Sequence, residues 1–272
     1  MDLPKRERMV DANGSSPSNG LPATQDAFLR GGGGSLLAPV RRFDPDSPEL
    51  IDRPGLDRAL LREELQTLEN CNRRLFGHDL VLQYVNRFVG WTRVVSLSIL
   101  DMGTGVADIP RAIAAWARQR QLPVVITAVD GNSEVLQIAR ESCHDWPEIR
   151  LEQHDLRSLP YEADSFDLVL CSLALHHFES AEAVAVLRRI HTLARHGYVV
   201  NDICRNWLAI WSTRLLFRAL FRSPVFRHDA AQSCRAAFTV RELRAMAERA
   251  GLGHFQIRHH HAMIRMVLEG RK

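Results

Sequence analysis

The segment Asp101-Met102-Gly103-Thr104-Gly105 constrains the fold of this sequence more than any other. An apolar run at residues 94–100, broken only by two serines, precedes it, and a helical pattern follows at residues 109–118. A strand, a glycine loop and a helix in this order form the ligand-binding corner of a doubly wound α/β sheet, where ligands bind beyond the carboxyl ends of the strands. The two glycines let the backbone bend and let a ligand approach the main chain. The segment therefore predicts a ligand site at this loop.

The spacing after the loop distinguishes two classes of cofactor. A dinucleotide-binding loop requires a small residue three places after its second glycine, where the helix N-terminus meets the pyrophosphate. Asp108 holds that place, and its carboxylate would repel a pyrophosphate. The order acid-x-Gly-x-Gly instead resembles the first motif of class I S-adenosylmethionine (SAM)-dependent methyltransferases, with Ala107 where that family often has a third glycine. The resemblance implies SAM as the cofactor and S-adenosylhomocysteine as its product.

The remainder of the chain alternates between strand and helix patterns. Apolar, β-branched runs lie at residues 124–129, 149–153, 166–171 and 198–200, with helical patterns between them, which predicts a parallel sheet with crossover helices. Residues 255–257 and 263–268 are predicted to close the sheet as an antiparallel pair. The family resemblance implies the same architecture, a doubly wound, mostly parallel seven-stranded sheet of Rossmann-like form.

Composition divides the chain and limits its partners. Residues 1–45 are rich in Gly, Ser and Asn and are predicted to be a disordered tail, residues 46–92 a helical cap, and residues 93–272 the SAM-binding domain. The net charge of +3 is too small to indicate a nucleic-acid partner. Five scattered cysteines suit reduced thiols. With no apolar run approaching the roughly 20 residues that cross a bilayer and no apolar signal core, we expect a cytoplasmic protein.

Polar residues follow each strand at what should be one edge of the sheet. Asp130, with Gly131 after it, ends the second strand, where a carboxylate can accept both hydroxyls of a ribose. Asp155 follows the third strand and can accept the amino group of adenine, and the amide of Leu156 can serve a ring nitrogen. An aspartate after a strand often only caps a helix or turn. Three in succession with this glycine loop favour cofactor binding, for which we select these residues: Asp101, Gly103, Thr104, Gly105, Asp130, Gly131, Asp155, Leu156 and Ser172.

Further motifs resemble narrower branches of the family. Residues 159–167 and 173–178 are similar to the segments around the fourth strand of ubiquinone/menaquinone-type methyltransferases. Residues 227–229 (Arg-His-Asp) and 235–239 resemble bacterial methyltransferases found beside type III polyketide synthases, which methylate phenolic lipids or related polyketides. This implies O-methylation of an apolar phenol in secondary metabolism. A quinone-type carbon methyltransferase is the alternative, and a catalytically inactive partner subunit is the alternative of another class, although the glycine loop and Asp130 are intact.

A phenol needs a base at neutral pH, and histidine is the residue type best suited to that role. The candidates are His176 and His177 after the fourth strand, and His228, with Asp202 as a further possibility. The triplet at residues 259–261 has no carboxylate or cysteine beside it in sequence, so we predict a surface turn and no metal site.

Residues 203–238 are predicted to be a lid inserted after the fifth strand. Tryptophan, phenylalanine and leucine alternate there with arginines at positions 205, 214, 218, 222 and 227. Such a basic amphipathic segment can close an apolar substrate pocket or lie on a membrane surface. The simpler alternative is a helix packed on the core with a solvated arginine face.

Overall fold

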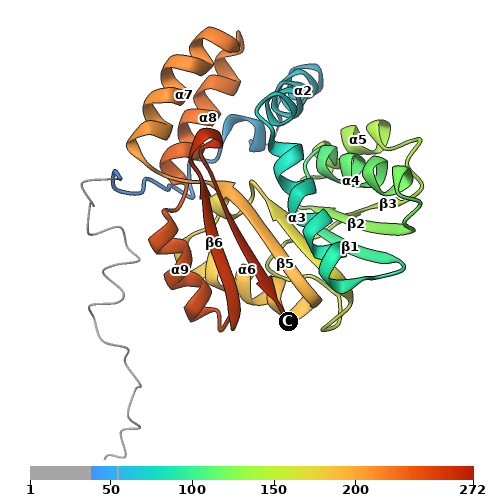
Figure 1. Ribbon diagram of the computed structural model, residues 1–272. Helices are drawn as coiled ribbons and strands as arrows, with labels where there is room; N and C mark the ends of the chain where they lie inside the picture. Colours follow the sequence, from blue (N-terminus) through green and yellow to red (C-terminus); the bar gives the residue numbers. More distant parts are fainter. Residues whose placement is uncertain (1–37, 54) are drawn as a thin grey trace, which may run out of the picture.

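The computed structural model describes residues 38–53 and 55–272, and its centre is a seven-stranded sheet in the order β3-β2-β1-β4-β5-β7-β6 (Figure 1). All neighbouring strands are parallel except β7, which is antiparallel to β5 and to β6. This confirms the predicted fold class and the closing hairpin. The strands are β1 (Leu97–Met102), β2 (Val124–Asp130), β3 (Ile149–Gln153), β4 (Phe166–Ser172), β5 (Ala194–Ile203), β6 (His254–His260) and β7 (Arg265–Arg271).

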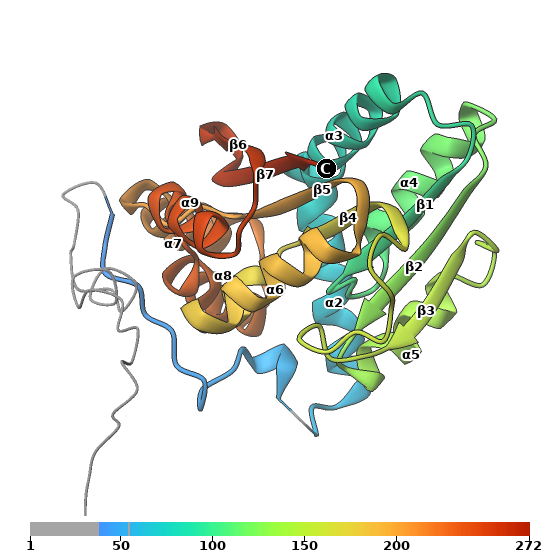
Figure 2. The ribbon, with the colours of Figure 1, turned by 90° about the horizontal axis from the view of Figure 1, so that it is seen from below.

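Helices cover both faces of the sheet, as Figure 2 shows from below. Side chains alternate between the faces along each strand. In β1, Ile99 packs toward α3 (Gly77–Thr92) and α4 (Asp108–Gln119), whereas Leu100 packs toward α6 (Ser180–Leu193) and α9 (Val240–Arg249). The remaining helices are η1 (Leu50–Asp52), α2 (Arg58–Arg74), α5 (Ser133–Ser142), η2 (Leu175–His177), α7 (Trp207–Leu220), α8 (Pro224–Ala236) and η3 (His261–Met263).

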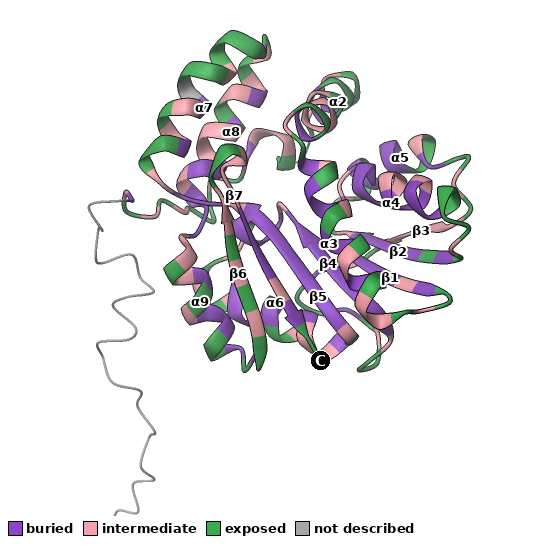
Figure 3. Ribbon diagram, in the orientation of Figure 1, coloured by how far each residue is buried: buried purple, intermediate pink, exposed green. Residues whose placement is uncertain are grey.

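The predicted lid is a pair of helices, α7 and α8, beyond the carboxyl end of β5. They stand beside α2 in Figure 1, and Phe226 of α8 packs on Cys71 of α2. Figure 3 shows buried residues along the central strands and exposed ones along much of α7. The carboxyl ends of β1, β2, β4 and β5 therefore open toward a space covered by α2, α7 and α8.

An extended segment, residues 38–53, runs against the lid, and we call it the strap (Figure 2). Arg41 donates from Nε to the carbonyl of Ala236 at 2.6 Å and from Nη2 to that of Phe178 at 2.8 Å. Arg205 donates to the carbonyl of Pro39 at 2.9 Å. Of the predicted tail, residues 1–37 lie outside the described residues, and residues 38–45 belong to the strap.

Gly270 of β7 makes the close packing of the antiparallel strand possible. It pairs with Tyr198 of β5, whose side chain is 1% exposed, and a Cβ at position 270 would lie 2.0 Å from Cζ of that ring. We predict that Gly270→Ala lowers the free energy of unfolding by about 3 kcal/mol, because the buried ring has to move. Urea unfolding measures the change.

Gly90→Ala is the matched control for that variant. Gly90 is exposed in α3, and a Cβ added there would meet no atom within 4 Å, so alanine should leave stability unchanged or raise it by up to ~1 kcal/mol. Equal effects of the two substitutions would contradict the packing argument.

Candidate functional site

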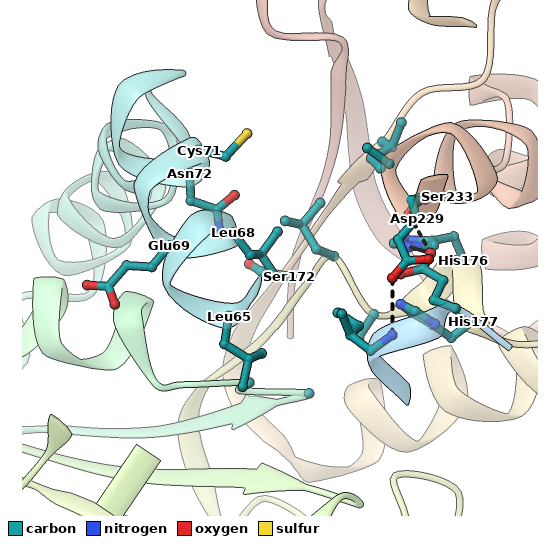
Figure 4. A pocket seen from close by; sticks show the side chains of 18 of the residues that line it. Leu65, Leu68, Glu69, Cys71, Asn72, Ser172, His176, His177, Asp229 and Ser233 are labelled. Atoms are coloured by element: carbon teal, nitrogen blue, oxygen red, sulfur yellow. Dashed lines mark hydrogen bonds and ion pairs between the residues drawn. The ribbon is translucent and has the colours of Figure 1, made fainter. Parts of the chain in front are cut away.

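A cavity of about 1150 Å³ lies at the carboxyl ends of the strands, between α2 on one side and η2 and α8 on the other (Figure 4). Its walls bring together residues that are far apart in the sequence. They include every residue predicted for cofactor binding except Asp155: Asp101, Gly103, Thr104, Gly105, Asp130, Gly131, Leu156 and Ser172. They also include His176 and His177 but not His228.

The glycine loop has the geometry that its sequence predicts. Gly103 has φ +76° and Gly105 has φ +55°, the left-handed region that favours glycine. A Cβ at Gly103 would lie 2.6 Å from Cβ of Ala174, so only glycine fits there. Ala107, where the family often has a third glycine, also has a positive φ of 56°.

The carboxylates beside this loop favour a cationic ligand. Oδ2 of Asp130 accepts the N–H of Gly105 and Oδ1 accepts that of Asn132, both at 2.9 Å, which fixes the carboxylate at the end of β2. Burial raises the pKa of Asp101 to about 7, and the nearby carboxylates of Asp108 and Asp130 add to the rise. A positive group in the cavity would relieve this repulsion. The residues present therefore fit the charged methionine end and the ribose of SAM.

Asp155 lies outside the cavity lining. Its carboxylate pairs with Arg157 at 2.7 Å, and Arg157 also reaches Glu182 at 2.9 Å. The next residue, Leu156, does line the cavity. The adenine contact predicted for Asp155 stays a prediction.

His176 sits in a buried ion-pair network at the other end of the cavity. Its Nδ1 lies 2.7 Å from Oδ1 of Asp202, and its Nε2 lies 3.8 Å from Oε1 of Glu49. Burial alone would lower the pKa of His176, but the two carboxylates outweigh burial and raise it to about 10. The two carboxylates thus favour the protonated form of His176 at neutral pH, and a role for it as the base stays the sequence-based prediction.

His177, next in the chain, has the opposite protonation state. Burial lowers its pKa to about 4, and the positive charge of His176 adds to the effect, so the ring is neutral. Nδ1 of His177 lies 3.4 Å from Oδ2 of Asp52, and the two side chains, which line the cavity, are 34% and 38% exposed. Burial raises the pKa of Asp52 to about 7, and the charges of Glu49, Asp130 and Asp229 contribute. The two side chains form a pair that faces the cavity and can take a proton near neutral pH.

The strap supplies Glu49 and Asp52, which the sequence reasoning missed. Asp229 of α8 accepts the backbone N–H groups of Leu50 and Ile51 at 2.9 and 3.1 Å, and Ser233 donates to Glu49. These contacts hold the strap over the histidine pair. No periodicity or motif marks residues 49–52 in the sequence, so only the tertiary structure could identify them.

His228 lies outside the cavity lining and contacts Asp229, the next residue in α8. Its side chain is 51% exposed, and its Nδ1 lies 3.0 Å from Oδ1 of Asp229. His228 is thus placed beside the residue that holds the strap. A catalytic role for it remains the sequence-based prediction.

One group of described residues brings three metal-ligating atoms together. Ligand atoms of Glu49, His176 and His177 lie within 4.8 Å of one another. A protonated imidazole has no lone pair for a metal, and His176 is held in that state by Asp202 and Glu49. Glu49 and His176 of this group form part of the ion-pair network with Asp202.

The comparisons with known proteins find a methyltransferase domain in the middle of the chain. Residues 99–197 match the family model for a methyltransferase domain. The uncharacterized methyltransferase YcgJ of Bacillus subtilis (strain 168) is 27% identical over 95 residues, covering 34% of this chain and 35% of YcgJ. Demethylmenaquinone methyltransferase of Lysinibacillus sphaericus (strain C3-41) is 25% identical over 165 residues, covering 56% of this chain and 68% of that protein. The chain thus spans about a third of the length of YcgJ and two thirds of that of the second relative.

A solved structure shares the fold. Magnesium protoporphyrin IX methyltransferase (ChlM) from Synechocystis PCC 6803, crystallised with bound S-adenosylhomocysteine, is 15% identical. The match covers 79% of this chain and 100% of that chain, with a TM-score of 0.53.

A substitution at Asp130 tests whether this end of the cavity binds the cofactor. We predict that Asp130→Ala weakens S-adenosylhomocysteine binding about 30-fold, because a charge-assisted hydrogen bond to the ribose contributes about 2 kcal/mol. Titration calorimetry measures the dissociation constant. Asp145→Ala, at a carboxylate 88% exposed, is the control and should change nothing. Equal affinity of the Asp130 variant and the wild type would contradict the assignment.

Proposed function

We propose that this chain, which carries a class I SAM-dependent methyltransferase domain, transfers a methyl group to the hydroxyl of an apolar small molecule such as a phenol or an aromatic polyketide. SAM is its cofactor and, when bound, supplies an electrophilic methyl group. The observation that carries the proposal is a proton-accepting pair, His177 and Asp52, facing the same cavity as the glycine loop.

The cavity has room for an acceptor beside the cofactor. Its volume of about 1150 Å³ exceeds the roughly 300–1,000 Å³ typical of a single ligand pocket. Away from the strand ends the lining is mostly apolar and comes from α2, α7 and α8: Leu68, Leu75, Leu216, Phe217 and Phe226. An apolar acceptor gains free energy by leaving water for such a surface.

The charges around the histidine pair suit a developing phenolate. A phenol has a pKa of about 10, so a base in reach lowers the cost of removing its proton. Asp52 and His177 accept that proton. The His176 cation, whose ring centroid lies 4.3 Å from that of His177, provides a fixed positive charge beside the oxygen that becomes negative.

Carbon methylation of a quinol is the second candidate, and the relative named demethylmenaquinone methyltransferase favours it. The same base and cavity would serve, so mass spectrometry of the methylated product distinguishes the two reactions. A partner subunit without activity would bind SAM and methylate none of the alkylphenols and quinols offered to it.

We further infer that α7 contacts an anionic membrane surface. Leu208, Trp211 and Leu215 are 64%, 62% and 78% exposed, and they lie on one side of the helix. No acidic residue occurs between Ile203 and His228, whereas five arginines do. Pairing with the same face of a second copy would bring arginines together, so an anionic lipid surface is the better complement.

Within the described part of the chain, no helix is long and apolar enough to span a bilayer. The proposed location is the cytoplasm. Leu216 of α7 both lines the cavity and is 44% exposed, so α7 joins the cavity wall to its exposed apolar face.

The proposed base predicts a pH dependence. The pair must be deprotonated to act, so kcat/KM for an alkylphenol should rise tenfold per pH unit below about 7 and level off above it. Asp52→Asn should lower kcat about 100-fold and remove the inflection. Both are measured by following the rate of S-adenosylhomocysteine formation at a series of pH values.

Asp46→Asn, at an exposed carboxylate of the same strap, is the control and should keep the wild-type profile. A wild-type profile without an inflection near pH 7, or an Asp52 variant with the wild-type profile, would exclude this pair as the base.

The membrane contact makes a separate prediction. The wild type should sediment with vesicles containing phosphatidylglycerol and less with pure phosphatidylcholine. Replacing Trp211 and Leu215 by serine should weaken binding roughly tenfold or more, because each side chain loses apolar burial. Val95→Ser, at an 87% exposed valine before β1, is the control. Unchanged sedimentation of the double variant would overturn the inference.

A further inference from the structure

Arg265 is a cation in the cavity wall that the proposed reaction does not use. It is the first residue of β7 and pairs with Ile203, the last residue of β5, so the sheet carries it to the end where the cavity lies. Its guanidinium lines the cavity beside α2 and α8. The sequence reasoning did not select it.

The hydrogen bonds of Arg265 leave much of its guanidinium unused. Nη2 donates to Oδ1 of Asn72 at 3.2 Å, and Nη1 is buried without a partner. Among the described residues, no carboxylate oxygen lies within the 4.0 Å of a salt bridge with Arg265. A guanidinium has five N–H donors, so the protein leaves most of this set free.

The groups around Arg265 do not balance its charge. Burial lowers its pKa, and Cys71, Asp202, Cys234 and Asp108 counteract burial only in part. Burial raises the pKa of the Cys71 thiol to about 11 and also that of Cys234, so both thiols are neutral. The carboxylate of Asp202 is paired with His176, and that of Asp108 lies 2.7 Å from His78.

Asn72 holds the guanidinium in one orientation. Its Nδ2 donates to Oδ2 of Asp108 at 3.3 Å, while its Oδ1 accepts from Arg265. Figure 4 shows the Asn72 side chain reaching from α2 into the cavity. Asn72 is therefore a positioning residue for the guanidinium.

A buried guanidinium with free donors is costly unless an anion pairs with it. Its planar fork matches the two oxygens of a carboxylate. We propose that Arg265 binds a carboxylate group inside the cavity. Two molecules can bring that group: SAM, through its amino-acid end, or the methyl acceptor, as an apolar compound with an acid group. The second source rests on the proposed function, and the experiment separates the two.

The test compares ligands with and without a carboxylate on Arg265→Gln. S-adenosylhomocysteine and 5′-methylthioadenosine differ in the amino-acid end, and 4-octylbenzoate and 4-octylphenol differ in the acid group. We expect Arg265→Gln to weaken one carboxylate ligand about 30-fold in calorimetric titration, since a charged hydrogen-bonded pair contributes about 2 kcal/mol. Its carboxylate-free counterpart should change less than about twofold.

The ligand that loses affinity identifies the source of the carboxylate. Loss for S-adenosylhomocysteine assigns Arg265 to the cofactor, and loss for 4-octylbenzoate assigns it to the acceptor. Unchanged binding of both would overturn the proposal. Because these measurements need no turnover, a failure to methylate phenols would contradict the proposed function and leave the Arg265 result intact.

One further variant and one further measurement separate binding from a structural role. Arg258→Gln, at an exposed arginine of β6 in the same hairpin, should bind all four ligands as the wild type does. The melting temperature of ligand-free Arg265→Gln should equal or exceed that of the wild type, because an unpaired buried charge is removed. A lower melting temperature with unchanged ligand binding would show a structural role only and overturn the proposal.

Discussion

The buried pair of His176 and Asp202 is the interaction on which the rest of the site depends. Asp202 ends the buried part of β5 and accepts both the Nδ1–H and the backbone N–H of His176, so it ties the loop after β4 to the sheet. The resulting imidazolium attracts Glu49 and thereby the strap. Burial lowers the pKa of the neighbouring His177, and the charge of His176 adds to that effect. One ion pair thus ties the loop to the sheet, attracts the strap and contributes to the low pKa of His177.

The two ends of the cavity are lined by groups of opposite charge. Near the glycine loop, Asp101 and Asp130 are carboxylates that burial makes reluctant to ionise, so they favour a cation. At the lid end lie two cations, His176, which is paired with Asp202, and Arg265, which has no salt bridge within the described residues. A ligand set that is positive at one end and negative at the other lowers the energy of both regions. A sulfonium cofactor with an acceptor that becomes an oxyanion is such a set.

The parts of the site that the sequence predicts are those whose position depends only on local chain geometry. A glycine loop after a strand and polar residues at strand ends lie at one edge of any parallel sheet, which is why Gly103, Asp101 and Asp130 could be placed without a structure. The roles of His176 and His177 could not, since adjacent histidines differ only through Asp202, 26 residues away, and through the strap. Arg265 and Asn72 lie 193 residues apart, and neither belongs to a motif.

The strap and the lid depend on each other. Asp229 and Ser233 lie on α8, and the backbone N–H groups of residues 50 and 51 donate to the buried Asp229 carboxylate, which otherwise has only His228 as a partner within the described residues. The same bonds deliver Asp52 to His177. Any motion of α8 that widens the cavity must therefore break the hydrogen bonds that hold the proposed base, or carry the strap along. Through these hydrogen bonds the position of α8 is linked to the position of Asp52 beside His177.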